Sequence, residues 1–205
     1  MDKAENNTLQ SILDEAKKEF MKNGYQKASL REIVKKAGLT TGAFYGYFKN
    51  KEKLFDALVG TEYNEMIRIY QNKLETFFKF SPEEQCENMV NITYECMIEL
   101  KDYMYDHYDA VKMILCYSDG TKYKDFVHIM AGMDVEATHD FAKTIETVNN
   151  QYNFVNPVLE HILTSGMFAG FFELIVHDVP RKDADEYIRQ LLDFYAAGWG
   201  KIMGF

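Results

Sequence analysis

The chain contains few cysteines, the residues that cross-link small secreted domains through disulfide bonds. Only three of its 205 residues are cysteine. Cys86, Cys96 and Cys116 form an odd set without the paired spacing of a zinc site. We therefore expect free thiols in a reducing cytoplasm, and neither disulfides nor structural zinc. No segment alternates polar and apolar residues over a useful length, which argues against β-strands.

Proline is also scarce, and its three positions are informative. Pro82 and Pro157 each follow a capping residue and so suit the first turn of a helix, and Pro180 follows a helical run. The polar N-terminus of mixed charge does not resemble a signal peptide. The least charged segment, residues 162–172, is too short to span a bilayer. The sequence thus predicts an all-α protein of the cytoplasm.

The sequence offers no clear catalytic or metal-binding cluster. The five histidines are dispersed, and the pairs Asp106-His107 and His139-Asp140 are weak metal hints because adjacent helical residues point in different directions. A phosphate-binding loop and a nucleophile elbow are both missing. We therefore expect no metal, no cofactor and no enzymatic activity.

The most informative segment is Ser29 to Phe55, SLREIVKKAGLTTGAFYGYFKNKEKLF. Ser29 and Glu32 have the spacing of a capping box, which places a helix start at about Leu30. Gly38 is suited to end that helix, because glycine adopts a left-handed backbone at least cost. Two short helices across a glycine turn are typical of a helix-turn-helix.

The second short helix carries small side chains in its first turn. Thr40 is placed to cap it, and Thr41, Gly42 and Ala43 follow. In this motif the start of the second helix contacts base edges, and surrounding residues hold phosphates. Asn50 is expected to cap the next helix, with Lys51 beside its free amides. The candidate DNA-binding residues are Ser29, Arg31, Thr40, Thr41, Gly42, Ala43, Tyr45, Tyr47 and Lys51.

The run AGLTTGAFYGYFKNKEKLF, preceded by ILDEAKKEFMKNGYQKASLREIV, closely resembles the DNA-binding domain of the tetracycline-repressor (TetR) family of bacterial transcription regulators. The resemblance implies an all-helical homodimer whose C-terminal domain binds a small molecule and thereby controls operator binding. Two departures are visible. Tyr47 lies where many members have histidine, and the segment before Leu9 is poor in basic residues. The alternative is that Tyr45 and Tyr47 are ordinary surface aromatics.

Charge is divided unevenly along the chain. Residues 1–55 hold 11 Lys and Arg against 7 Asp and Glu, a net charge of +4, whereas the remaining 150 hold 12 against 25, a net charge of −13. A basic end on an acidic body would steer the molecule to meet DNA by that end. A chance excess in an acidic protein is the alternative.

We expect two domains, a three-helix helix-turn-helix domain over 1–55 and a helical effector-binding and dimerisation domain over 56–205, joined by a long helix. The expected helices cover about 8–23, 51–78, 82–105, 108–116, 122–148, 157–177 and 184–203, in addition to the two short ones. Asp183 and Glu186 have capping-box spacing before the last of these.

Two further residue groups carry expectations about the second domain. Glycines and an apolar stripe near the C-terminus suit a four-helix dimer interface formed by Ile162, Gly166, Gly170, Leu191, Leu192, Tyr195 and Trp199, although the stripe could also pack inside a monomer. Methionines and aromatics suit a pocket for an apolar or aromatic effector, and the candidates are Met97, Met104, Tyr108, Met113, Tyr117, Phe126, Met130, Phe168 and Phe172.

The sequence therefore predicts a ligand-responsive, homodimeric DNA-binding regulator that represses transcription from a palindromic operator. Two rival interpretations remain. One is an enzyme that uses the central cavity, and the other is a helical small-molecule-binding or scaffold protein with a vestigial helix-turn-helix.

Overall fold

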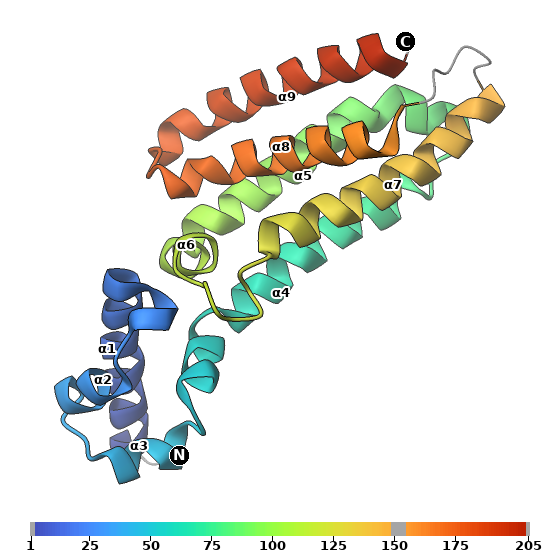
Figure 1. Cartoon of the computed structure of the whole chain (residues 1–205). Coiled ribbons are helices and arrows are strands. Elements are labelled where there is room, and N and C mark those ends of the chain that lie inside the picture. The colour runs from blue at the N-terminus through green and yellow to red at the C-terminus, as the bar shows by residue number, and fades with distance from the viewer. Residues whose placement is uncertain (1–2, 149–154, 204–205) are drawn as a thin grey trace. The chain divides into compact units, whose positions relative to one another are not determined.

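The structure is a computed structural model of the whole chain, and it describes residues 3–148 and 155–203 (Figure 1). Within these ranges the protein is all-α and contains no strand, as predicted. The helices are α1 (Lys3–Lys27), α2 (Leu30–Lys36), α3 (Thr41–Tyr47), α4 (Lys51–Phe77), α5 (Pro82–Asp106), α6 (Tyr108–Cys116), α7 (Phe126–Val148), α8 (Pro157–Val176) and α9 (Arg181–Met203).

Most helix ends agree with the expected ends to within one residue, but those of three helices do not. Helix α1 extends to Lys27 and is interrupted at Gly24, whose φ of 70° is left-handed. Helix α7 begins at Phe126 and not at Lys122, because the hydroxyls of Ser118 and Thr121 make local hydrogen bonds that compete with a helix.

The expected capping box before α9 is wrong. Helix α9 begins at Arg181, directly after Pro180, and the amide of Asp183 donates to the Pro180 carbonyl over 2.9 Å. Asp183 therefore lies inside the first turn, where its charge still complements the helix dipole. The full reciprocal capping box occurs instead before α5, between Ser81 and Glu84.

The chain forms two compact units, each built from two segments. Unit 1 comprises Met1–Asn64 and Tyr108–Lys124, and unit 2 comprises Glu65–His107 and Asp125–Phe205. Helix α4 contributes to both units. The expected division after residue 55 was drawn from the helix-turn-helix alone and stays a prediction.

The core of unit 1 is aromatic. Phe20 of α1 and Phe55 of α4 are fully buried, and their ring centroids lie 5.1 Å apart. Phe44, the one fully buried side chain of α3, anchors that helix, and Tyr123, which follows α6 in the sequence, packs its ring 5.9 Å from Phe55. The segment after α6 therefore completes the same core as the first four helices.

Unit 2 is a bundle in which α8 packs against α7 and α9, and α5 packs against α7 and α9 (Figure 1). Helix α8 is mostly apolar, and its Phe168, Phe171 and Phe172 are buried. At 20 residues it is long and apolar enough to cross a membrane, which the expected shorter segment was not. In the structure, 44% of its most apolar stretch is buried inside the protein.

Candidate DNA-binding and effector-binding sites

Helix α2 is bounded by a cap at each end. The Ser29 hydroxyl accepts a hydrogen bond from the Glu32 amide over 3.3 Å, which confirms half of the predicted capping box. Gly38 has a φ of 72°, and the Leu39 amide donates to the Val34 carbonyl over 3.0 Å. This pairing is the Schellman motif, and it ends α2 as the sequence predicted.

The other half of the capping box is replaced by a residue that the sequence analysis missed. The Ser29 amide donates over 3.2 Å to Glu19 of α1, which also accepts from Asn23 and from the Lys36 ammonium. Burial alone raises the pKa of Glu19, but these donors outweigh it and lower the pKa below its usual value. Glu19 thus ties α1 to both ends of α2.

Helix α3 is short, capped and largely open to solvent. The Thr40 hydroxyl accepts from the Ala43 amide over 3.2 Å, as predicted, and the Asn50 side chain accepts from the Lys53 amide over 2.8 Å at the start of α4. Phe44 is buried and fixes the rotation of α3, so the other face turns outward. The exposed residues on this face are Thr41, Gly42, Ala43, Tyr45 and Gly46.

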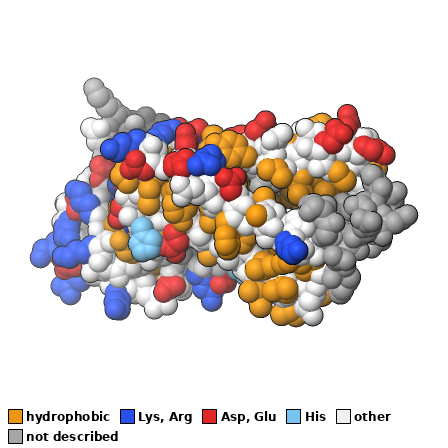
Figure 2. All heavy atoms as spheres, turned by 90° about the horizontal axis from the view of Figure 1, so that it is seen from above, with side chains coloured by type: hydrophobic (Ala, Val, Ile, Leu, Met, Phe, Trp, Pro, Cys, Tyr) orange, Lys and Arg blue, Asp and Glu red, His pale blue; other side chains and the backbone are white. Residues whose placement is uncertain are grey.

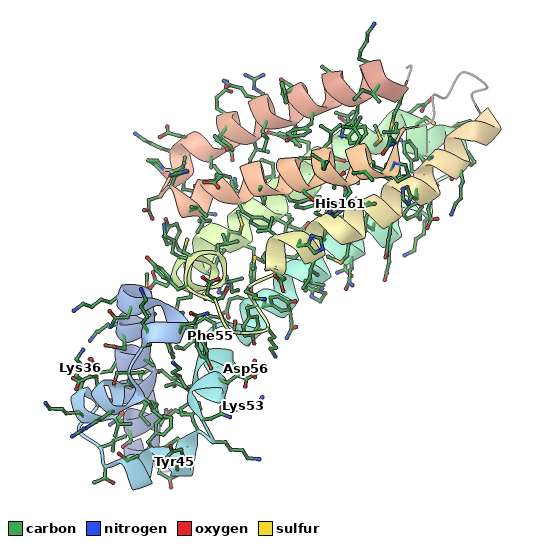
Figure 3. All side chains as sticks on the ribbon, viewed as in Figure 1. Lys36, Tyr45, Lys53, Phe55, Asp56 and His161 are labelled. Atoms are coloured by element: carbon green, nitrogen blue, oxygen red, sulfur yellow. The ribbon has the colours of Figure 1, made fainter. Side chains whose placement is uncertain are left out.

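The outer face of α3 has little bulk near its start. A Cβ built at Gly42 would meet only the Thr40 hydroxyl oxygen, at 4.0 Å, and one built at Gly46 would meet nothing within 4 Å. Tyr45 is 55% exposed and lies on the outside of the helix (Figure 3), whereas Tyr47 is half-buried. A slender helix start followed by an exposed hydroxyl is the shape that enters a major groove.

Basic side chains surround this helix. Arg31 and Lys35 on α2 and Lys49 before α4 are exposed, and no ion pair involves them within the ranges that the structure describes. In the view of Figure 2, Lys and Arg side chains gather at the left end, over α1 and α2. Free surface cations of this kind are available to phosphates.

Lys51 is placed differently from the other candidates. Its ammonium donates to the carbonyl oxygens of Tyr25, Gln26 and Ala28 over 2.7, 3.3 and 3.2 Å, and it lies 4.6 Å from the centre of the Tyr25 ring. Burial lowers the pKa of Lys51. All three donors are engaged, so a contact with phosphate would require at least one of these bonds to break.

Unit 2 contains a cavity of about 160 Å³. Residues of α4, α5, α7, α8 and α9 line it, and most are apolar. The apolar lining consists of Leu74, Phe77, Met89, Val90, Ile92, Met97, Ala137, Phe141, Met167, Leu192, Ala196, Trp199 and Met203. A site with such walls and few polar groups suits a small apolar ligand.

Polar groups enter the cavity at a few points. Asp134 of α7 lines it and accepts a hydrogen bond from the hydroxyl of Tyr70 on α4. Burial raises the pKa of Asp134 to about 6, the bond from Tyr70 opposes that rise, and the charge of Glu160 adds to it. Cys96 of α5 is buried at the same wall, and burial raises the pKa of its thiol to about 12, so it is an inert thiol.

Comparison with known proteins agrees with the geometry of unit 1. Residues 12–58 match the family described as bacterial regulatory proteins, tetR family. This segment is a TetR-family helix-turn-helix domain. The matched segment contains the whole of α2 and α3 and the first turns of α4. The family printed for this segment is one of regulatory proteins, so the match favours the regulator interpretation over the enzyme interpretation.

Individual relatives extend this result. Over 50 residues this chain is 48% identical to the Transposon Tn10 TetC protein of Escherichia coli, a match that covers 24% of this chain and 25% of that protein. The chain spans about a quarter to a third of the length of the first curated relatives it matches. These matches therefore support the assignment of the helix-turn-helix and give no information on the function of unit 2.

Solved structures cover nearly the whole chain but show the fold alone. NalD of Pseudomonas aeruginosa, described as the secondary repressor of the MexAB-OprM multidrug efflux pump, has a TM-score of 0.54 at 19% identity, covering 94% of this chain and 97% of that chain. FadR of Bacillus subtilis, solved with stearoyl-CoA, has a TM-score of 0.50 at 14% identity, covering 89% and 97%.

Of the predicted effector residues, Met97 lines the cavity. Met104, Phe126, Met130, Phe168 and Phe172 are buried in unit 2 but do not line the cavity. Tyr108, Met113 and Tyr117 belong to unit 1. Periodicity had placed these residues inward, but it could not separate a cavity wall from a filled core.

The predicted dimer residues divide between two environments. Leu192, Tyr195 and Trp199 face the cavity of unit 2. A Cβ built at Gly166 would lie 3.0 Å from the Tyr195 hydroxyl, and one at Gly170 would lie 3.3 Å from Leu191, so both glycines let α9 approach α8 within one chain.

The opposite sides of α8 and α9 remain open. Val158 and Ile162 on α8 are 67% and 59% exposed, and Phe194 on α9 is 73% exposed. Figure 2 shows hydrophobic side chains at the surface in the view onto α9.

The weak metal hints are not supported by geometry. Among the described residues, no three His, Cys, Asp or Glu side chains gather as a metal site would require. His139 instead lies 2.5 Å from Glu160 of α8, and the His107 ring stacks on Tyr103 at 4.3 Å. The three cysteines are free thiols.

Proposed function

We propose that this chain is a cytoplasmic TetR-family transcription regulator that binds a palindromic operator as a homodimer and represses transcription until a small molecule binds unit 2. The observation that carries the proposal is the open face of α3, where a capped helix start without bulky side chains is followed by the exposed Tyr45. The family match to the same segment supports it.

Each candidate DNA residue has a physical role in this proposal. Thr41 and Ala43 would contact base edges, because a hydroxyl bonds either groove edge and a methyl group packs against thymine. Gly42 would allow the backbone to approach closely. Thr40, Tyr45 and Tyr47 would donate to phosphates, and Ser29, Arg31 and Lys51 would flank them.

A dimer is favoured because one short helix reads too few bases. Two helices about 34 Å apart would read two half-sites of a palindrome. The exposed apolar side chains of α8 and α9 are the surface we assign to this association, with Ile162, Val158 and Phe194 at its centre. The other predicted interface residues would lie beneath this surface and set the packing of α8 against α9. They are Gly166, Gly170, Leu191, Leu192, Tyr195 and Trp199.

The cavity of unit 2 is the proposed effector site. Its residues come from α4, which also contributes to unit 1, and from the two helices assigned to the dimer. A ligand that prefers one arrangement of these helices would change operator affinity by a coupling of roughly 1–3 kcal/mol. The known ligands and targets of NalD and FadR belong to those proteins, and they indicate only that the fold accommodates such roles.

The direct test is anisotropy titration on duplex DNA from upstream of the protein's own gene. We expect tight binding to that duplex, weak and strongly salt-dependent binding to a shuffled duplex, and a marked loss for Tyr45→Ala and Arg31→Ala. The matched controls are Tyr94→Ala and Lys182→Ala, which alter exposed residues of unit 2. Equal binding to both duplexes, or unchanged binding by the α2 and α3 variants, would contradict the proposal.

A further inference from the structure

The cavity of unit 2 has one feature that an ordinary apolar pocket lacks, which is a carboxylate in its wall. Asp134 lies on α7 at an inward position between the buried Met130 and the cavity residue Ala137. It is neither fully buried nor exposed, as expected of a side chain that borders a cavity. A carboxylate placed among apolar groups is costly unless something compensates its charge.

No basic side chain among the described residues supplies that compensation. The hydroxyl of Tyr70 donates one hydrogen bond to Asp134, and the other charged group that acts on it is the carboxylate of Glu160 on α8, which repels it. Glu160 already has its own partner, His139, at 2.5 Å. Asp134 therefore keeps a charge and acceptor capacity that no protein cation satisfies.

The lysine of the cavity wall is already paired. Lys73 of α4 lies 3.2 Å from Glu99 and 3.8 Å from Glu95. Both of these carboxylates line a neighbouring groove on α4 and α5 and not the cavity. An anionic ligand in the cavity would thus face the unpaired Asp134 without a free lysine, and the site disfavours it.

We propose that the effector of this protein is a small lipophilic amine, whose ring occupies the apolar cavity and whose ammonium group pairs with Asp134. The regulatory role of this ligand rests on the proposed function, but its binding can be measured without DNA. The cavity volume of about 160 Å³ sets the size of the apolar part. A cavity of about 150 Å³ accommodates benzene, so one aromatic ring fits.

The charge on Asp134 makes the binding depend on pH. Burial raises its pKa to about 6, so the carboxyl is largely protonated at pH 5 and largely ionised at pH 7. An ammonium ligand binds the ionised form, and its affinity should therefore rise about tenfold from pH 5 to pH 7. The other titratable groups around the cavity are Tyr70 and Lys73 of α4, Cys96 of α5, Glu160 with His139, and Tyr195 of α9.

The experiment is isothermal calorimetry on the full-length protein with three probes of similar shape, namely phenethylamine, phenethyl alcohol and phenylpropionate. We expect the amine to bind about 10 to 100 times more tightly than the alcohol at pH 7.5, and the carboxylate to bind weakest. Asp134→Asn should reduce the preference for the amine to about threefold or less and remove its pH dependence. The amide introduced by this substitution would keep an oxygen that accepts from Tyr70, so the fold should survive.

The matched control is Asp140→Asn, which neutralises an exposed carboxylate on the same helix and should leave both the preference and the pH profile unchanged. If Asp134→Asn does not fold, the wild-type amine-to-alcohol ratio and its pH dependence still decide the question. Equal affinity of the wild type for amine and alcohol, or tighter binding of the carboxylate, would overturn the inference. Failure of DNA binding with intact amine selectivity would overturn the proposed function alone.

Discussion

Gly42 offers a test in which the predicted effects on DNA binding and on stability have opposite signs. The position is helical, and a Cβ there would meet only the Thr40 hydroxyl oxygen at 4.0 Å, so side chains fit without strain. Glycine inside a helix is less favourable than other residues by roughly 0.5–1 kcal/mol, and an acidic residue in the first turn gains about 0.3–1 kcal/mol from the dipole. Gly42→Glu should therefore raise the free energy of unfolding by about 1 kcal/mol.

The same substitution should strongly weaken operator binding. It places a carboxylate where the proposed complex brings the start of α3 against bases and phosphates, once in each subunit. With a cost of about 1–3 kcal/mol for each half-site, the expected loss is about 30-fold or more. Gly42→Gln has the same size without the charge and should lose less, and Gly42→Ala should lose least.

Urea unfolding and DNA anisotropy on the same preparations measure both quantities. Gly132→Glu adds an equal charge to α7 at a position with nothing within 4 Å of the new Cβ, and it should leave DNA binding unchanged. If Gly42→Glu binds the operator as well as the wild type does, or unfolds at lower urea concentration, then α3 is not the surface described.

Three other perturbations have expected outcomes. Lys122 and Tyr123 donate hydrogen bonds to Asp56 and lower its pKa from 3.8 to about 2. Asp56→Asn should therefore lower the free energy of unfolding by about 2 kcal/mol at pH 7. The difference in stability from the wild type should disappear as the pH falls from about 4 to about 2. Lys51→Met leaves three carbonyls without their donor and should lower the free energy of unfolding in urea by about 1–3 kcal/mol. Lys49→Met, at an exposed lysine, should change it very little. Equal effects of the two substitutions would refute the stabilising role of the Lys51 hydrogen bonds at the end of α1. Phe194→Ser should raise the dimer dissociation constant in sedimentation with little change in monomer stability, because the ring is 73% exposed, and an unchanged constant would place the interface elsewhere.

The sequence predicted helix ends best where the capping chemistry is local. Thr40, Gly38 and Asn50 act on amides or carbonyls within a few residues, so their roles follow from spacing alone. The start of α7 could not be found in this way. There, Tyr123 is held by Asp56, which is 67 residues away, and such a contact leaves no periodic signal.

The functional interior was harder to predict. Apolar periodicity identifies inward positions, but Met97 at the cavity and Met104 in the filled core have the same pattern. The informative signal was a charged residue at an inward position. Two charged residues lie on otherwise apolar helix faces: Glu19, three residues after the buried Ala16, and Asp134, four residues after the buried Met130. The sequence analysis did not identify the role of either residue.

The division of unit 1 between two stretches of chain has a consequence for how the protein is made. The Tyr25 amide donates to the Tyr117 carbonyl over 2.9 Å, and Tyr123 packs on Phe55. When only the first 64 residues have emerged from the ribosome, one side of the aromatic core of unit 1 is therefore still exposed to solvent. That domain can close only after residue 124 emerges, so shortened gene products that end before it should be prone to proteolysis.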